Sequence, residues 1–229
     1  MSDPSTNPLI ELNSVSRHIS EAGGKRTILD QITFTAGKGN FISITGPSGA
    51  GKSTLLNLIS GIDIPDSGQV VCCGKNLHEM SDTQRTQFRK SCIGYVFQFF
   101  NLIPTLTVLE NLQLPLSLNN ATEDENATMQ WLERFDLADR HDAYPDVLSG
   151  GEQQRIAVIR AAIHKPEIIV ADEPTGNLDQ SSGRKVLSAL QEIALNGTCI
   201  VMATHNQEAA EFASSNYRLE DGRLKTVDT

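Results

Sequence analysis

The stretch FISITGPSGAGKST, residues 41–54, joins a short apolar segment to a glycine-rich loop and then to the start of an apolar helix. It matches the pattern G-x-x-x-x-G-K-[ST] in the strand–loop–helix setting that this pattern requires. Glycines allow backbone N–H groups to turn inward around an anionic phosphate, and the helix N-terminus adds a partial positive charge. The alternative is a glycine-rich turn without a ligand, but the strand before the loop and the helix after it favour a phosphate site.

The side chains of this loop indicate a nucleotide held together with a magnesium ion. Lys52 can reach the β- and γ-phosphates of a triphosphate, and the Ser53 hydroxyl can complete a Mg²⁺ coordination shell. The residues expected to hold the nucleotide are Gly46, Pro47, Ser48, Gly49, Ala50, Gly51, Lys52, Ser53 and Thr54.

Two acids follow a second apolar segment, IIVADE at residues 168–173. At the C-terminal end of a strand in an open α/β sheet, side chains face the ligand crevice. Asp172 is therefore expected to bind Mg²⁺ directly or through water, and Glu173 is expected to polarise an attacking water. Two solvated acids at a strand end are the alternative, and the phosphate loop favours the functional interpretation.

Short apolar segments alternate with helical stretches, which is typical of an α/β fold with a largely parallel sheet. Expected strands are Gln31–Ala36, Phe41–Thr45, Gly68–Cys73, Ile93–Phe97, Ile168–Asp172, Cys199–Thr204 and Asn216–Glu220. Expected helices are Lys52–Ser60, Asp82–Arg89, Ala127–Phe135, Glu152–His164 and Ser181–Leu195. Between residues 98 and 165 helical patterning replaces the strand signal. We expect one domain, with a core of about residues 1–97 and 166–229 and an inserted helical subdomain of about residues 98–165.

A second loop that suits an anion precedes an amphipathic helix at residues 148–155, LSGGEQQR. Its serine and glycines again form a loop and helix N-terminus able to bind an anion. One triphosphate needs only one such cradle, so we expect a head-to-tail dimer with each nucleotide between one chain's Lys52 loop and the other chain's Ser149 loop. The nucleotide-binding candidates of this stretch are Ser149, Gly150, Gly151 and Gln153.

Taken together, these motifs resemble those of the nucleotide-binding subunit of ATP-binding cassette (ABC) transporters. Besides the stretches quoted above, the chain has YVFQFFNLIPTLTVLEN around Gln98, GNLD ending at Asp179, and MATHN around His205. The resemblance implies a P-loop NTPase core with antiparallel β elements near the N-terminus, ATP and Mg²⁺ as cofactors, and ATPase activity. Within this family, the chain is most similar to the branch that contains lipoprotein-release (LolD-like), macrolide-export (MacB-like) and cell-division (FtsE-like) ATPases.

The resemblance also assigns roles to three residues that are weak signals alone. Gln98 would sense the γ-phosphate and its metal and would link to the membrane subunit; alone it would be a surface or core glutamine. His205 would be the switch histidine at the γ-phosphate; alone it would be a polar residue at a strand end. Asp179 would belong to the dimer-contact loop and can also cap the helix that starts near Ser181.

One departure from the family pattern concerns the base of the nucleotide. The family stacks adenine on an aromatic residue, whose place falls here on Ile19, with His18 beside it. No Tyr, Phe or Trp occurs before Phe34. Since stacking on an aromatic side chain contributes about 1–3 kcal/mol per base, we expect weaker or less base-selective binding, with His18 or Ile19 covering the base.

Composition limits the partners. Of 229 residues, 39% are hydrophobic, and no apolar run approaches the about 20 residues of a membrane-spanning helix. Residues 1–8 lack the features of a secretory signal. We therefore expect a cytoplasmic protein. The resemblance to ABC transporters implies that a separate integral membrane permease holds it peripherally at the inner face of the membrane, docking near Gln98, Phe99, Phe100 and Leu102–Leu106; the alternative is that these residues pack between the two subdomains. The net charge of −9 argues against a nucleic-acid partner.

Two other functions share part of this pattern. A soluble ABC-type protein acting on nucleic acid or ribosomes would carry a coiled-coil insert or two cassettes, and this chain has one cassette and no heptad run. A small-molecule kinase would share the phosphate loop, but this function does not account for the LSGGEQQR stretch.

Overall fold

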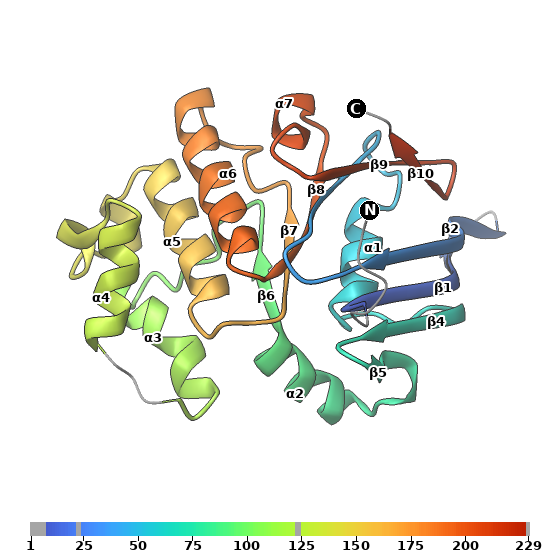
Figure 1. The fold of residues 1–229 in the computed structure, drawn as a ribbon, viewed down its shortest axis with the longest axis horizontal. Coiled ribbons are helices and arrows are strands. Elements are labelled where there is room, and N and C mark those ends of the chain that lie inside the picture. Colours follow the sequence, from blue (N-terminus) through green and yellow to red (C-terminus); the bar gives the residue numbers. More distant parts are fainter. Residues whose placement is uncertain (1–7, 22–23, 122–124, 228–229) are drawn as a thin grey trace.

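The computed structural model describes residues 8–21, 24–121 and 125–227. The expectation of no secretory signal rests on residues that are almost all outside these ranges. The elements lie in three regions: a mainly parallel sheet in the middle, helices on one side of it, and an antiparallel sheet on the other (Figure 1).

The central sheet has six strands in the order β10-β9-β3-β8-β7-β6. Its strands are β3 (Phe41–Thr45), β6 (Ile93–Val96), β7 (Ile168–Asp172), β8 (Cys199–Thr204), β9 (Ser215–Glu220) and β10 (Arg223–Val227). All neighbours pair in parallel except β10, which pairs antiparallel with β9. Parallel pairing brings the C-terminal ends of β3, β7 and β8 to one edge, where the loops that follow them meet.

Side chains along these strands point alternately to the two faces of the sheet, and this divides the interior into two apolar clusters. In β8, Val201 faces the cluster next to the antiparallel sheet, whereas Ile200 and Met202 face the cluster under the helices. In β7, Val170 and Ile169 are divided in the same way. Successive strand residues point to opposite faces, so a fully apolar strand is the sequence of a sheet covered on both sides.

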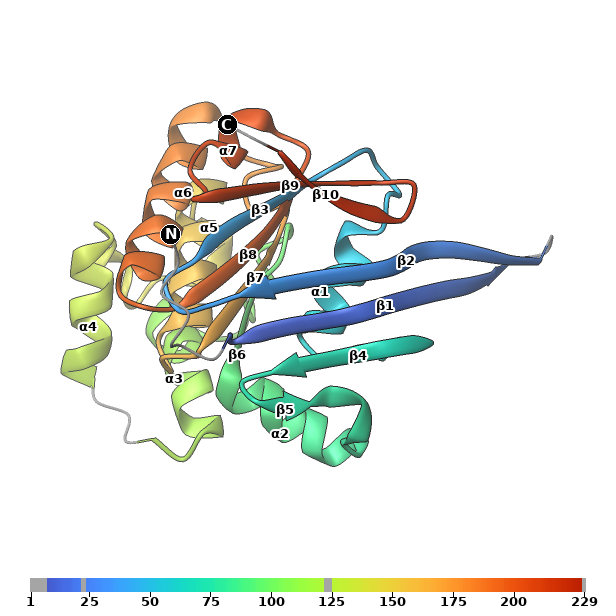
Figure 2. The same ribbon diagram turned by 45° about the vertical axis from the view of Figure 1, so that its right-hand side comes forward.

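The antiparallel sheet has the order β2-β1-β4-β5 and projects from the core as a long hairpin with two further strands (Figure 2). Its strands are β1 (Ile10–Glu21), β2 (Gly24–Ala36), β4 (Ser67–Cys72) and β5 (Lys75–Asn76). Helix α1 (Lys52–Ile59) packs between the two sheets, with Leu55, Leu56, Leu58 and Ile59 fully buried. The hairpin is thus fixed beside the loop that precedes α1.

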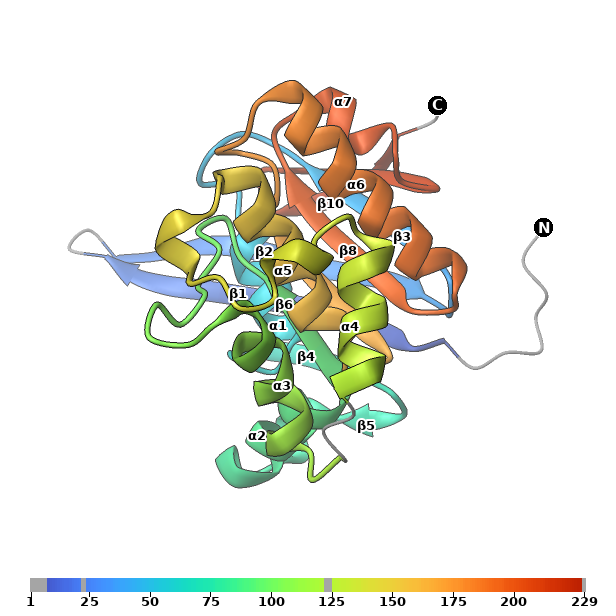
Figure 3. The same cartoon turned by 90° about the vertical axis from the view of Figure 1, so that its left-hand side faces the viewer.

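Apart from α1, the helices lie between β5 and β6, between β6 and β7, and in the chain after β7. They are α2 (Asp82–Cys92), α3 (Val108–Leu118), α4 (Glu125–Arg134), α5 (Gly150–Ala162), α6 (Gln180–Leu195) and α7 (Gln207–Ala210), with single 3-10 turns at Leu77–Glu79, Ala138–Arg140 and Pro145–Val147. Figure 3 views the molecule from the side that α3, α4 and α5 cover. Helices α5 and α6 share one apolar cluster with the central sheet. The division into a core and a helical subdomain at residues 98 and 165 stays a prediction.

The sequence prediction located most elements within about three residues and missed five of them, β1, β5, β10, α3 and α7; β5 and α7 are very short. Strand β1 was not predicted because register shifts between Leu12 and His18 interrupt its alternation. Strand β2 begins seven residues before the predicted start at Gln31, whose φ of 50° marks an irregularity in that strand. Helix α3 contains Pro115, which usually argues against a helix interior. Strand β10 is short and mostly exposed, so its pattern carries little signal.

Candidate functional site

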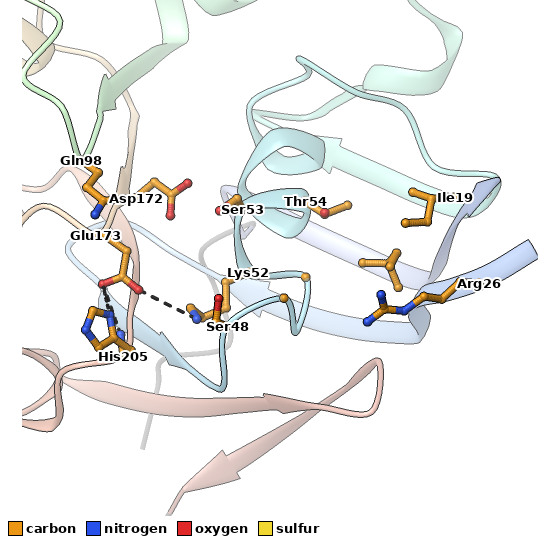
Figure 4. A pocket seen from close by; sticks show the side chains of 13 residues that line it. Ile19, Arg26, Ser48, Lys52, Ser53, Thr54, Gln98, Asp172, Glu173 and His205 are labelled. Carbon is orange, nitrogen blue, oxygen red and sulfur yellow. Dashed lines mark hydrogen bonds and ion pairs between the residues drawn. The ribbon is translucent and has the colours of Figure 1, made fainter. Parts of the chain in front are cut away.

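A cavity of about 630 Å³ opens where the hairpin, the loop before α1 and the ends of β7 and β8 meet (Figure 4). It is lined by Ile19, Arg26, Ile28, Ser48, Gly49, Gly51, Lys52, Ser53, Thr54, Gln98, Asp172, Glu173 and His205. The structure thus brings together residues from six separate segments. Ten of the lining residues were predicted from the sequence as site residues, in the phosphate loop, at or after the strand ends and in the Gln98 segment.

The loop before α1 has a backbone that only glycine allows at two positions. A Cβ on Gly46 would lie 2.3 Å from Leu219 O, and one on Gly51, with φ of 102°, would lie 2.7 Å from Ile28 Cγ2. Gly51 is the N-cap residue of α1 and supplies no side-chain cap. The first N–H groups of α1 are therefore directed toward the loop, as an anion requires.

The Lys52 ammonium lies inside this loop. Its Nζ donates to Gly46 O at 2.8 Å and to Pro47 O at 3.2 Å, and the residue is buried. It is also 3.9 Å from Glu173 Oε1, across the cavity. A buried ammonium between the loop and an acid is placed to meet the oxygens of a phosphate.

Glu173 directly follows β7 and is held in a fixed orientation. Its backbone has φ of 48°, and its N–H donates to Ala203 O at 2.9 Å. Its Oε2 lies 2.9 Å from His205 Nδ1 and accepts from the His205 N–H at 3.3 Å. Only 14% of the Glu173 side chain is exposed, against 67% for His205. The carboxylate is therefore held at the cavity wall by a histidine that solvent can reach.

Asp172 and Ser53 face each other beside this pair. Burial raises the pKa of Asp172, and the carboxyl of Glu173 raises it further, while the hydrogen bond with Ser53 and the charge of Lys52 lower it. A partly desolvated carboxylate next to a hydroxyl is a pair of hard oxygen ligands. Within the described residues there is no group of three or more His, Cys, Asp or Glu side chains that could hold a metal by themselves.

Gln98 follows β6 in an irregular segment, residues 97–107, whose backbone is held by side chains. Asn177 donates to Gln98 O at 3.2 Å, and Gln154 of α5 donates to Phe97 O at 3.0 Å. Arg160 of α5 donates to Phe100 O and Asn101 O at 3.1 and 2.7 Å. The helix that follows the second loop is thus bonded directly to the segment that carries Gln98.

The second loop, around Ser149, lies outside the large cavity. Ser149 caps α5, and its N–H and Oγ donate to Glu152 Oε2 at 2.8 and 2.7 Å. These bonds, with the contact to Arg140, lower the pKa of Glu152 to about 2. A separate hollow of about 250 Å³ is lined by Ser149, Gly151, Glu152, Arg155, Ser182 and Lys185. Within one chain, the two anion-binding loops therefore open into different hollows.

The remaining candidates lie next to these hollows. Asp179 caps α6 by accepting from Ser182 N at 3.0 Å, which confirms the predicted capping role. Pro47 and Ala50 line a further hollow of about 380 Å³ beside the turn at residues 220–222. Gln153 donates to Leu148 O at 3.1 Å, and a Cβ on Gly150 would lie 3.4 Å from Phe100. None of these five residues lines the large cavity.

At the end nearest the hairpin, Ile19, Arg26 and Ile28 line the cavity. His18 does not, because its ring lies on the other face of the hairpin, 3.1 Å from Thr27 Oγ1, and its N–H donates to Asp66. Of the two residues expected to cover a base, the structure therefore places only Ile19 in the cavity. Sequence reasoning missed Arg26 and Ile28, which become visible only when the full length of β2 is known.

Comparison with known proteins shows the family to which this chain belongs. Residues 29–176 match the family model described as ABC transporter. The chain belongs to the ABC transporter family. It is 46% identical over 220 residues to an uncharacterized ABC transporter ATP-binding protein of Mycobacterium tuberculosis, covering 95% of this chain and 89% of that protein. It is 36% identical to the lipoprotein-releasing system ATP-binding protein LolD of Shewanella denitrificans, covering 99% of this chain and 98% of that one.

Solved ABC structures have the same fold. A dimeric ATP-binding cassette in a post-hydrolysis state, bound to ADP and Pi, matches with a TM-score of 0.86 and 34% identity over 96% of this chain and 99% of that one. The P-loop NTPase fold and the resemblance to the LolD branch, both expected from the sequence, are confirmed, and the chain is an ABC-type ATPase. No helix in the described ranges is both long enough and apolar enough to cross a bilayer.

Proposed function

We propose that this chain is the ATP-hydrolysing motor subunit of a membrane ABC complex that extracts lipoproteins or exports other cargo. One observation carries the proposal: a single cavity joins the Lys52 loop to Asp172, Glu173, Gln98 and His205. A triphosphate in the Lys52 loop would point its terminal phosphate toward the two acids, because Lys52 lies between the loop and Glu173. The family membership supports ATP as that triphosphate.

Ser53 and Asp172 fit a Mg²⁺ ion. They face each other at the cavity wall and offer hard oxygens, and phosphate oxygens and water would supply the other ligands. Gln98 lies on the same side of the cavity as Asp172 and could add an amide oxygen. When bound, the ion would neutralise charge on the β- and γ-phosphates.

In the hydrolytic step, Glu173 would act as the general base. Its carboxylate is oriented by a hydrogen bond from the His205 N–H and by the nearby His205 ring, so it can accept a proton from a water placed beside the terminal phosphate. Lys52 would balance the negative charge that develops on the phosphate oxygens. His205, which is mostly exposed, would couple the presence of the terminal phosphate to the element that covers this edge of the molecule.

The covering element would be a second copy of the chain. Ser149, Gly150 and Gly151 form a loop and helix N-terminus that opens into its own hollow, away from the Lys52 loop of the same chain. A head-to-tail dimer would place that hollow over the partner's nucleotide, with Gln153 and Asp179 at the interface. The dimeric state of the solved cassette supports this arrangement.

The membrane partner would be a separate permease at the cytoplasmic face of the membrane. The chain covers 98% of LolD, which is named as the ATP-binding protein of a lipoprotein-releasing system. Phe99, next to Gln98, is 68% exposed, which is unusual for a phenylalanine and suits an apolar docking contact. Movement of the Gln98 segment would reach α5 through Arg160 and Gln154.

Turnover of ATP by purified variants tests the catalytic assignment. Lys52→Ala should abolish ATP binding or hydrolysis, and Glu173→Gln should keep ATP binding while slowing hydrolysis by about 10²–10⁴-fold, the usual effect of losing a general base. Glu167→Gln is the matched control, because Glu167 pairs with Lys38 away from the cavity. Normal hydrolysis by Lys52→Ala, or an equal loss in Glu167→Gln, would contradict the assignment.

Affinity purification of Glu173→Gln with ATP and Mg²⁺ from detergent-solubilised membranes of its source cell tests the partner. One stoichiometric integral membrane protein is expected, and Phe99→Asp should reduce its recovery without changing ATP binding. A soluble dimer without a membrane protein, or ribosomal protein and RNA in its place, would contradict the motor role.

A further inference from the structure

The chain around Gln98 is irregular, and side chains from other elements hold its backbone. It follows β6 and runs through residues 97–107 without helix or strand. Four of its carbonyls accept hydrogen bonds from side chains, and they belong to Phe97, Gln98, Phe100 and Asn101. Because a segment without regular structure is not fixed by a ladder of backbone bonds, these contacts determine where the Gln98 backbone lies.

Arg160 of α5 makes two of these contacts with one side chain. Its Nη1 donates to Asn101 O at 2.7 Å, and its Nη2 donates to Phe100 O at 3.1 Å. Asn101 has a φ of 51°, a left-handed conformation that asparagine adopts more readily than most residues. The guanidinium fork is planar and rigid, so the two bonds fix two successive carbonyls relative to each other at this turn.

The Arg160 guanidinium is anchored in the packed part of the molecule. It extends from a helix whose residues Ile156, Val158 and Ile159 are fully buried in the cluster that α5 shares with the central sheet. The residue is half-buried, and burial lowers its pKa. Hydrogen bonds from a charged donor are stronger than those between neutral groups. The two bonds of Arg160 therefore tie the Gln98 segment to a rigid element.

We propose that Arg160 is a positioning residue for ATP hydrolysis, which holds Gln98 at the acid end of the cavity. The inference rests on the proposed function, because it takes Gln98 to contact the metal ion or the terminal phosphate. Figure 4 shows Gln98 on the same side of the cavity as Asp172. Arg160 does not line the cavity and acts through the backbone two and three residues after Gln98. Without its bonds this turn is freer to shift, and Gln98 spends less time beside Asp172.

Arg160→Met is the informative variant, because methionine keeps an apolar stem and removes both donors. One hydrogen bond from a charged donor corresponds to about tenfold or more in an equilibrium, so kcat for ATP hydrolysis should fall by about tenfold or more. The Kd for ATP without Mg²⁺ should change by less than about twofold, because Arg160 lies outside the cavity. Arg160→Lys can bond one carbonyl at a time and should lose less activity than Arg160→Met.

A double-mutant cycle with Gln98→Ala distinguishes positioning from general damage to the fold. If Arg160 acts through Gln98, the double variant should hydrolyse ATP within about twofold of Gln98→Ala alone, whereas independent effects would multiply. Arg89→Met is the matched control. Arg89 of α2 is also half-buried and donates to a backbone carbonyl, Gly61 O, at 2.7 Å, outside the cavity. Its loss should leave kcat within about twofold of the wild-type value.

The outcomes separate this inference from the function on which it rests. An unchanged kcat in Arg160→Met, an equal loss in Arg89→Met, or multiplied effects in the double variant would overturn the role of Arg160 and leave that of Gln98 intact. Unchanged hydrolysis in Gln98→Ala would overturn both. If Arg160→Met does not fold, Arg160→Lys decides the matter. Its kcat should fall by about threefold or more, the effect of one weaker hydrogen bond, and this loss should disappear in the Gln98→Ala background. No loss, or a loss that persists in that background, would overturn the inference.

Discussion

The segment that carries Gln98 depends on one buried amide, and its removal gives a measurable loss of stability. Asn111 of α3 is fully buried. Its Oδ1 accepts from Ile103 N at 2.8 Å, and its Nδ2 donates to the carbonyls of Ile103, Leu106 and Thr107 at 2.9–3.1 Å. This buried amide therefore supplies hydrogen-bond partners to backbone groups of a segment that has no helix or strand partners of its own.

Asn111→Leu keeps the approximate volume and removes these bonds. The carbonyls of Ile103 and Thr107 keep backbone donors, Leu106 N and the N–H of residue 111. Two groups, Ile103 N–H and Leu106 O, then lose the amide, at about 1–3 kcal/mol each when they stay buried. The more apolar leucine offsets up to about 2 kcal/mol. The expected loss in the free energy of unfolding is about 2–4 kcal/mol, a large share of the about 5–15 kcal/mol of a typical domain.

Urea denaturation of the wild type and of Asn111→Leu measures this loss, and hydrogen exchange of residues 97–107 locates it. Asn119→Leu is the control, because Asn119 lies at the half-buried end of the same helix, where water can replace its bond to Lys90 O. That control should lose less than about 1 kcal/mol. A loss below about 0.5 kcal/mol in Asn111→Leu, with unchanged exchange in residues 97–107, would refute the reasoning.

Three other variants test separate parts of the structure. Glu152, with a folded-state pKa of about 2, stabilises the protein above its ordinary pKa and loses this contribution as pH falls toward 2; acid titration of the unfolding free energy should therefore be flatter for Glu152→Gln between about pH 4.5 and 2. Gly94→Ala places a Cβ 2.1 Å from Ala161 O and should lower the unfolding free energy by about 1–3 kcal/mol in urea denaturation. Ile19→Tyr should lower the Kd for ATP and GTP alike, by about fivefold or more in equilibrium titration, since stacking contributes about 1–3 kcal/mol; His18→Ala, on the other face of the hairpin, should leave both Kd values unchanged.

The sequence predicted the parts of the site that motifs define. The phosphate loop and the acids after β7 are contiguous stretches, and their setting in strands and helices is a local property of the chain. Gln98 and His205 are single residues in variable surroundings, and only the order of the family motifs selected them. The structure then placed both in the same cavity as Lys52.

The parts that the sequence did not predict depend on contacts between distant segments. Arg26 lines the cavity because β2 extends far beyond its apolar stretch and pairs with an equally long β1. Asn111 and Arg160 look like ordinary helix residues in the sequence, and their role appears only when the Gln98 segment is seen to lack regular partners. Ser149 and Lys52 were both predicted to bind a phosphate, but only the fold shows that they open into separate hollows within one chain.

The central claim is that ATP is held between the Lys52 loop of one chain and the Ser149 loop of another. The most direct measurement is the mass of Glu173→Gln in solution by light scattering, with and without ATP and Mg²⁺. The account predicts one chain of 24.9 kDa without nucleotide and twice that mass with it, and predicts that adding Ser149→Arg abolishes the dimer without changing the Kd for ATP. A single-chain mass at saturating ATP and Mg²⁺ would contradict the account.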